Sequence, residues 1–307
     1  GSALAQAWPS KPISLVVPFP PGGTTDVLAR SLAEKLTQSL GQTVIVENLG
    51  GASGGLAAQK LLNTANDGRM IFQGSPNELI LSPYVNPDIK FKPEQFRHIT
   101  QITANPLMLV VRPDHPAKTV DEFVEYLKKS TKPIAYGSVG VGSLYHVLTE
   151  DMAKQIGAKV THVPYKGAAP MLQDIAGGQI DFTIFPYAKS YKGLEEQKKL
   201  RQLAWIAKER NAFDKDVAAF GESKSLPNFN HAIWAGIFVR KDTPDNIVAA
   251  LNAAIAKVMA TPEIRTAIGN TGSIVIDTTA PDVADKFFAA EVGKLNAMAK
   301  TMDLKPQ

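Results

Sequence analysis

Residues 13–36 read ISLVVPFPPGGTTDVLARSLAEKL, and this stretch decides how the chain is organised. The apolar run predicts a β-strand, and Gly22 and Gly23 predict a sharp turn because glycine takes positive φ without steric cost. Leucines spaced four residues apart predict a helix that packs on a sheet and begins at Thr24 to Asp26. Such a helix start offers unpaired N–H groups and a positive dipole end, so it favours an anion. The alternative is an ordinary first βα turn of an α/β domain.

The order of strand, glycine loop and helix recurs along the chain. TVIVE (43–47) and RMIFQG (69–74) continue the first series, and PIAYGSV (133–139) starts a second one that ends with QIDFTIFP (179–186). This alternation predicts an α/β fold with mostly parallel sheets flanked by helices. Each series places glycine loops at the carboxyl ends of its strands, where open α/β sheets bind ligands.

Two places predict a change of domain. Asn105-Pro106 interrupts an extended apolar segment, and HAIWAGIFVR (231–240) is expected to return to the first domain. Two crossings between two lobes predict a hinge. The predicted lobes are 8–105 with 232–307, and 106–231, with 1–7 outside both.

The composition limits the classes of function. The chain has 307 residues, no cysteine, a formal net charge of +4 and 44% hydrophobic residues. The lack of cysteine excludes disulfides and thiolate catalysis, and the five histidines show no metal-ligand spacing, so we expect no metal. No motif indicates nucleic acid, and no apolar run is long enough to insert into a membrane. A weak preference for anionic small molecules is all that the charge supports.

The first residues indicate export. Gly1-Ser2 is typical of a cloning remnant, and Ala3-Leu4-Ala5 matches the A-x-A pattern of a signal-peptidase site. We therefore expect the mature protein to begin near Gln6 and to lie outside the cytoplasm.

Five motifs follow one another in a recognisable order: VVPFPPGGTTD, VIVENLGGASGG, GSVGVGSLYH, HVPYKGAAPMLQDIAGGQIDF and GIFVRKDTP. From about Trp8 to the C terminus, this order resembles the substrate-binding proteins of tripartite tricarboxylate transporters, the Bug family. The resemblance implies a two-lobed periplasmic-binding-protein fold that closes on a small carboxylate, without a cofactor and without catalysis. It also implies a periplasmic location and membrane transporter subunits as partners. We expect a monomer.

The same resemblance implies ligand-binding residues around the glycine loops of both lobes. In the first lobe they are Phe19, Pro21, Gly22, Gly23, Thr24, Asp26 and Ser75. In the second lobe they are Ser138, Val139, Gly140, Gly142, Ser143, Tyr145, His146, Tyr165, Gly167, Asp181 and Tyr187. Neither glycine loop contains an arginine, so we expect main-chain N–H groups, hydroxyls and helix dipoles to hold one carboxylate in each lobe.

Departures from the family pattern leave alternatives open. Tyr145 stands where the family usually has a small residue, and Phe185-Pro186-Tyr187 replaces a polar segment. This bulk favours a larger or aromatic dicarboxylate, unless both tyrosines only pack at the rim. His146 either bonds a carboxylate or braces its loop, and Asp26 either caps its own helix or meets a ligand amine.

A serine hydrolase is the competing hypothesis. Gly51 to Gly55 satisfy G-x-S-x-G around Ser53, and Asp181 and His231 follow in the order that a hydrolase needs. Asn48 to Gly50 separate this motif from its strand, although a nucleophile elbow requires a tight turn. A dinucleotide enzyme is disfavoured because GSVGVGS lacks the third glycine of G-x-G-x-x-G.

Overall fold

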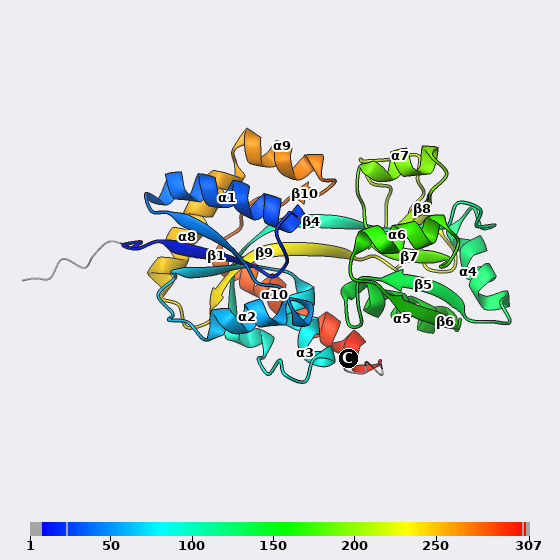
Figure 1. The fold of residues 1–307 in the computed structure, drawn as a ribbon, viewed down its shortest axis with the longest axis horizontal. Helices are drawn as coiled ribbons and strands as arrows, with labels where there is room; N and C mark the ends of the chain where they lie inside the picture. Colours follow the sequence, from blue (N-terminus) through cyan, green and yellow to red (C-terminus); the bar gives the residue numbers. More distant parts are fainter. Residues whose placement is uncertain (1–7, 23, 303, 305–307) are drawn as a thin grey trace, which may run out of the picture. The chain divides into compact units, whose positions relative to one another are not determined.

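The computed structural model describes residues 8–22, 24–302 and 304, and the fold below refers to these residues. They form an α/β chain whose contacts divide it into two compact units (Figure 1). Unit 1 comprises Gly1–Thr103, Trp234–Gly269 and Val275–Asn296, and unit 2 comprises Ala104–Ile233, Asn270–Ile274 and Ala297–Gln307. The predicted lobe boundaries, as limits of parts that move against each other, stay a prediction.

Unit 1 is built on a sheet in the order β2-β1-β3-β9. Its elements are β1 (Ile13–Val17), α1 (Thr24–Leu40), β2 (Val44–Asn48), η1 (Ala52–Gly54), α2 (Gly55–Leu62), β3 (Met70–Gly74), the π-helix η2 (Asn77–Leu81), α3 (Ser82–Val85), η3 (Pro93–Gln95), the first part of β4 (Phe96–Val111), most of β9 (Ala232–Arg240), α8 (Asp245–Met259), α9 (Pro262–Asn270) and most of α10 (Pro281–Lys300). Strand β1 pairs in parallel with β2 and β3, whereas β9 is antiparallel to β3. The predicted parallel sheet is therefore completed by an antiparallel strand that returns late in the chain.

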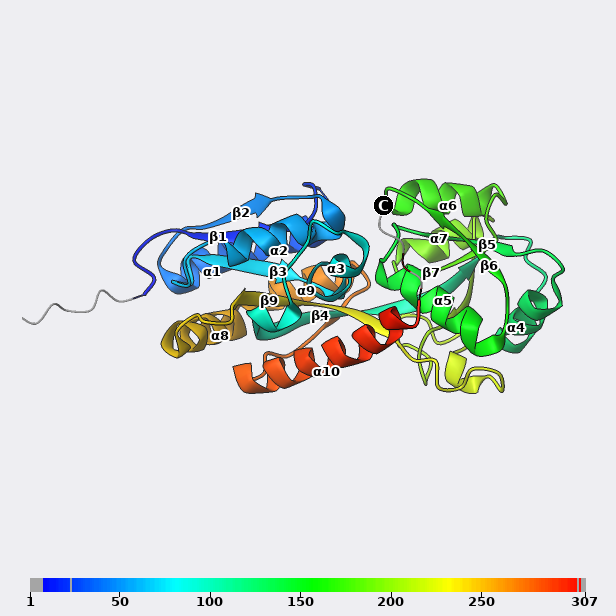
Figure 2. The ribbon, with the colours of Figure 1, turned by 90° about the horizontal axis from the view of Figure 1, so that it is seen from below.

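The core of unit 1 follows the apolar periods of the sequence. Leu15 lies opposite Val46 and Ile71 in the sheet, and the predicted stripe of α1 contributes Leu32 and Leu36, both buried. These side chains join one hydrophobic cluster with residues of α8 and α9. Helices α1, α8 and α9 thus cover one face of this sheet, and α2 and α10 cover the other (Figures 1 and 2).

Unit 2 contains a second sheet with the same central arrangement. Its elements are the rest of β4, α4 (Val120–Lys129), β5 (Ile134–Ser138), α5 (Leu144–Ile156), β6 (Val160–Pro164), α6 (Ala168–Ala176), β7 (Phe182–Pro186), α7 (Ser190–Glu196), β8 (Arg201–Trp205) and η4 (Phe220–Glu222). Strand β5 is parallel to β6 and β7, and β4 pairs antiparallel with both β7 and β8. Helices α6 and α7 pack into one cluster with β4, whereas Phe123 of α4 packs on Phe182 from the opposite face.

One predicted feature differs from the structure: strand β4 runs without a break through Asn105-Pro106, which was predicted to interrupt it. Late in the chain, the short strand β10 (Ile274–Val275) pairs with β4. No single described helix is long and apolar enough to cross a membrane. Helices α8 and α9 together have the length and apolar composition of such a helix, but their axes are bent by 74° where they meet.

Candidate functional site

Unit 1 gathers three loops at the carboxyl ends of its parallel strands. They are residues 18–26 after β1, 48–54 at the end of β2 and 75–78 after β3, and we call them the first loop cluster. Because these strands are adjacent and parallel, their carboxyl ends lie at one edge of the sheet. The turn at Gly22 has φ +92°, the left-handed conformation that its prediction required.

Asp26 holds the first loop cluster together. Its Oδ2 accepts from Gly22 N at 2.9 Å and from Arg30 Nε at 3.0 Å, and its Oδ1 accepts from Asn48 Nδ2 at 2.8 Å. The Arg30 hydrogen bond, helped by Gly22 and Asn48, lowers the pKa of Asp26 to about 2. Its side chain is only 3% exposed. Asp26 was predicted either to cap its own helix or to meet a ligand amine; these contacts instead join the loop before α1, Arg30 of α1 and Asn48 of β2, and they occupy the N–H of Gly22.

Two further residues of this cluster were not singled out from the sequence. Asn48 also donates to Phe19 O at 3.0 Å, so it fixes two loops at once. Glu78 is fully buried, and its Oε2 accepts from Ser75 N at 2.6 Å. Burial raises the pKa of Glu78 to about 7. The sequence signal that could have identified Glu78 is its position directly before the apolar run Leu79–Leu81.

Unit 2 has a corresponding arrangement, which we call the second loop cluster: residues 138–146 after β5, with His162 of β6 and Tyr165. Gly140 and Gly142 take φ of +136° and +75°, so both turns require glycine. Ser143 caps α5 by accepting from His146 N, and its Oγ donates to Gly140 O at 2.8 Å. Polar side chains of this loop thus satisfy its own backbone.

Two stacked histidine rings belong to the second loop cluster. The rings of His146 and His162 stack with centroids 4.0 Å apart and 7° between their planes. His146 Nδ1 accepts from Gly142 N at 2.9 Å, so the neutral ring carries its proton on Nε2. Burial lowers the pKa of both rings to about 4. The cluster is therefore uncharged at neutral pH, and its contacts support the loop-bracing role of His146.

The serine–histidine contact in this cluster does not have the chemistry of a nucleophile and its base. His162 Nε2 lies 2.6 Å from Ser138 Oγ, but Ser138 is fully buried, and the same Oγ also donates to Gly140 O and accepts from Gly140 N. A ring with a pKa of about 4 is a weak base near neutral pH. This contact is suited to shaping the loop.

Two residues predicted for the site, Asp181 and Tyr187, lie outside the second loop cluster, whereas Tyr145 lies within it. Asp181 precedes β7, at the amino end of that strand, and accepts from Arg112 Nε at 2.9 Å. Tyr187 is 7% exposed and packs on Trp205 with ring centroids 4.9 Å apart. Tyr145 is buried edge-to-face against Phe185. These contacts favour the packing interpretation of both tyrosines.

The remaining predicted residues are placed as follows. Phe19, Pro21 and Gly22 are exposed, and Ser75, Val139, Gly140, Tyr165 and Gly167 are half-buried. Tyr165 N donates to Ser138 O at 2.8 Å, and its hydroxyl donates to Asp174 Oδ2 at 2.7 Å. Gly23, the side chain of Thr24 and the export signal predicted in residues 1–7 lie outside the described residues.

The hydrolase hypothesis gains no support. Ser53 is exposed in a left-handed conformation, with φ 52° and ψ 33°. Over residues 8–22, 24–302 and 304, no hydrogen bond joins it to a histidine, and Asp181 is engaged by Arg112. The same residues contain no group of three acidic or histidine side chains that could hold a metal.

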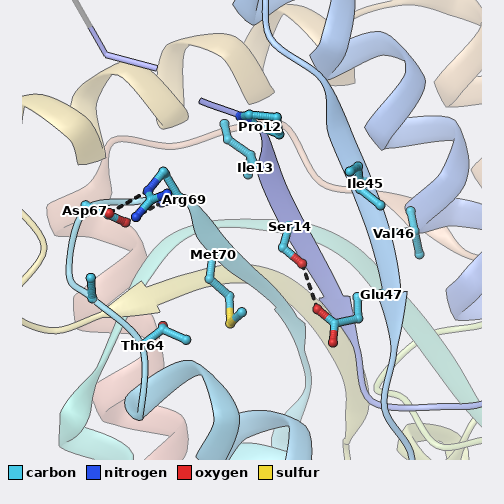
Figure 3. A pocket seen from close by; sticks show the side chains of 11 residues that line it. Pro12, Ile13, Ser14, Ile45, Val46, Glu47, Thr64, Asp67, Arg69 and Met70 are labelled. Carbon is cyan, nitrogen blue, oxygen red and sulfur yellow. Dashed lines mark hydrogen bonds and ion pairs between the residues drawn. The ribbon is translucent and has the colours of Figure 1, made fainter. Parts of the chain in front are cut away.

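A pocket in unit 1 lies away from both loop clusters. It has a volume of about 500 Å³ and lies on the face of β1, β2 and β3 towards their amino ends (Figure 3). Ser14 donates to Glu47 there at 3.0 Å, and Arg69 pairs with Asp67 at 2.6 Å. None of its lining residues belongs to either loop cluster. Its polar groups already bond one another, so the pocket alone indicates no ligand.

Comparison with known proteins places this arrangement in a family. Residues 28–304 match the model of the tripartite tricarboxylate transporter family receptor. Protein BugT of Bordetella pertussis is 30% identical over 290 residues, which cover 94% of this chain and 88% of BugT.

Solved structures give the same result for the fold. An R. palustris protein with adipate is 29% identical with a TM-score of 0.83, over 98% of this chain and 100% of that one. MatC from Rhodopseudomonas palustris with bound malate is 28% identical with a TM-score of 0.81, over 95% and 100%. The periplasmic binding protein BugD is 27% identical with a TM-score of 0.80, over 98% and 100%. The predicted two-lobed periplasmic-binding-protein fold is confirmed.

Proposed function

Because the chain belongs to the tripartite tricarboxylate transporter receptor family, as its motifs predicted, we propose that it captures a small carboxylate in the periplasm and delivers it to a tripartite tricarboxylate-type membrane transporter. The family match over residues 28–304 carries this proposal. Relatives solved with adipate and with malate support a dicarboxylate as the ligand. We also propose that the chain acts as a monomer.

The second loop cluster supports the recognition of an acid group. An uncharged site adds no repulsion to a carboxylate, and the N-terminal end of α5 supplies a positive dipole. His146 adds an Nε2–H donor, because Gly142 N occupies its other nitrogen. Hydrogen bonds to a charged ligand contribute about 1.5–3 kcal/mol each, so a few of them reach micromolar affinity.

The first loop cluster is the proposed site for the second carboxylate. Helix α1 contributes its N-terminal end, and Ser75 contributes a half-buried hydroxyl group. The ionised Asp26 opposes an anion in this cluster, but Arg30 compensates its charge at 3.0 Å. Recognition here therefore depends on the arrangement of the loops more than on net charge.

The size of the ligand is the finer part of the proposal. The sequence favoured a larger or aromatic dicarboxylate because of Tyr145 and Tyr187. Since both rings are buried against other aromatic side chains, the contacts support an aliphatic diacid such as those bound by the relatives. We therefore propose a C4 to C6 aliphatic dicarboxylate.

Thermal shift and calorimetry test the function. The ligands are malate, adipate and a benzene dicarboxylate, and adipamide is the uncharged control with the length of adipate. A ligand at 100 times its Kd stabilises the folded state by about 2.7 kcal/mol, which raises Tm by a few degrees. We expect the aliphatic diacids to bind and adipamide to have no effect.

The possible outcomes separate the parts of the proposal. Equal shifts with adipamide would show that the acid groups are not recognised. Tighter binding of the aromatic acid would restore the hypothesis of a bulky ligand. The absence of binding by every carboxylate tested would contradict the proposed function.

A further inference from the structure

The side chain of Glu78 lies where the loops of the first loop cluster meet. A Cβ atom at Gly54 would lie 2.2 Å from Glu78 Cγ and 2.9 Å from Pro18 Cβ. Ser75 N donates to Glu78 Oε2 at 2.6 Å. Glu78 therefore supports the loop at the end of β2 and the loop after β3, next to the loop after β1.

Among the described residues, no charged group contributes to the shifted pKa of Glu78. The groups that face it from the neighbouring elements are uncharged: Pro18, Gly54, Ser75 and Ser82, whose Oγ donates to Glu78 O at 2.7 Å. Among the described residues its Oε1 has no hydrogen-bond partner. Hydrogen bonds from Ser75 and from the Glu78 backbone favour the ionised carboxylate, but they lower its pKa less than burial raises it, so the neutral acid is favoured in this position. The raised pKa of about 7 agrees with this geometry.

We propose that Glu78 is a positioning residue, which allows the first loop cluster to accept a carboxylate only while its own side chain is uncharged. This inference rests on the proposed function, because it concerns the same site. A ligand carboxylate held by the loops would lie near a buried charge if Glu78 were ionised, and two like charges in a poorly screened site repel strongly.

Linkage makes the inference quantitative. If ionisation of Glu78 weakens ligand binding, then ligand binding must favour protonation of Glu78 by the same factor. Binding near pH 7 is therefore accompanied by proton uptake. With a midpoint near 7, the uncharged fraction falls about tenfold between pH 6 and pH 8, so the affinity falls by about the same factor.

The test is calorimetry of the full chain with adipate and with malate at pH 6, 7 and 8. We expect the wild-type Kd to rise about tenfold over this range, and the binding heat to show proton uptake in buffers of different ionisation enthalpy. Glu78→Gln keeps the size of the side chain but cannot ionise, so its Kd should be independent of pH. The exposed Glu34 of α1 provides the matched control, and Glu34→Gln should retain the wild-type slope. An unchanged slope in Glu78→Gln would overturn the inference.

A second measurement needs neither a variant nor a ligand. NMR titration of the side-chain carboxyls, with ¹³C-labelled glutamate in the wild-type chain, should show one glutamate with a midpoint near 7. If every glutamate titrates below pH 5.5, Glu78 is charged at neutral pH and the inference is wrong. If one titrates near 7 but neither diacid binds, the proposed function fails and the ligand-dependent part of the inference fails with it.

Discussion

The two loop clusters occupy the same position on their sheets but are held together by opposite kinds of groups. In the first, the carboxyl groups of Asp26 and Glu78 accept loop N–H groups. In the second, Ser138 Oγ and His146 Nδ1 do so. A carboxyl acceptor brings a charge that must be compensated or neutralised, whereas a hydroxyl or imidazole does not. Similar loops can therefore be held together either by carboxyl groups, which become charged above their pKa, or by groups that are neutral at pH 7.

The pH dependence of stability has opposite signs for Glu78 of the first cluster and for the two histidines of the second. The pKa of Glu78 is higher in the folded state than its usual 4.5, so stability falls as pH rises from 4.5 towards about 7. The pKa values of His146 and His162 are lower than their usual 6.5, so the unfolded chain binds more protons below 6.5. Stability therefore falls as pH decreases from 6.5 towards about 4.

The largest effect is expected from Gly54→Ala in the first cluster. The new methyl group would collide with Glu78 and Pro18, and φ +85° disfavours any L side chain. We expect a loss of about 3–5 kcal/mol in the free energy of unfolding, measured by denaturant titration. Gly41→Ala is the matched control, because φ is +67° with no atom nearby, and it should cost about 1–2 kcal/mol. Equal losses would mean that Glu78 does not support this loop.

Asp26→Asn should give the next largest effect, because it removes the charged acceptor shared by Gly22, Arg30 and Asn48. The pKa of Asp26 is lowered to about 2, so its contribution is complete above pH 3.8 and is lost as pH falls through 2. The Tm difference from wild type should thus be clear at pH 7 and disappear near pH 2. The exposed Asp88 supplies the control, and Asp88→Asn should be neutral. A difference that persists at pH 2 would show that the charge is unimportant.

His146→Phe tests the second cluster. The ring stack on His162 can remain, but Gly142 N loses its acceptor, so we expect a loss of about 1–2 kcal/mol at pH 7. The decrease in Tm between pH 6.5 and 4 should be smaller than in wild type, because the variant lacks the buried imidazole of His146, whose pKa is lower in the folded than in the unfolded state. Parallel curves for the two proteins would contradict the assignment of His146 as a buried neutral ring.

The smallest effect is expected from Asp181→Asn. The change weakens the ion pair with Arg112 and costs about 1 kcal/mol, the usual range for a partly exposed pair. The affinity for adipate should stay within about twofold, because Asp181 lies at the amino end of β7. Arg112→Met and the double variant complete a double-mutant cycle for the pair. A large loss of affinity in Asp181→Asn would return this residue to the binding site.

The sequence predicted the parts of the site that are close together along the chain. Gly22 and Asp26 form one turn, and Gly140 to His146 form another, so short-range turn and capping rules were sufficient. Asn48, Glu78 and His162 were missed because they reach the clusters from neighbouring elements: Asn48 and His162 from strands β2 and β6, and Glu78 from the π-helix after β3. Their positions depend on the register of a parallel sheet, for example Ser138 opposite Pro164, and a single sequence does not reveal this register.

Strand direction explains the placement of Asp181. Ligand loops follow the carboxyl ends of parallel strands, whereas Asp181 precedes its strand. The tyrosines illustrate a different limit. The sequence around an aromatic residue beside a glycine loop does not show whether its ring faces a ligand or packs on another ring such as Phe185 or Trp205. Only the tertiary contacts distinguish these cases.

The strand order of unit 1 has a consequence for the order in which its sheet can form. Strand β9 lies between β3 and β4, although it is made more than a hundred residues after either of them. Until the ribosome has released residue 240, β3 has no partner on one side, and an apolar surface remains uncovered. Strand β3 is therefore fully paired only when β9 is present, so completing the sheet of unit 1 depends on contacts between segments far apart in the sequence.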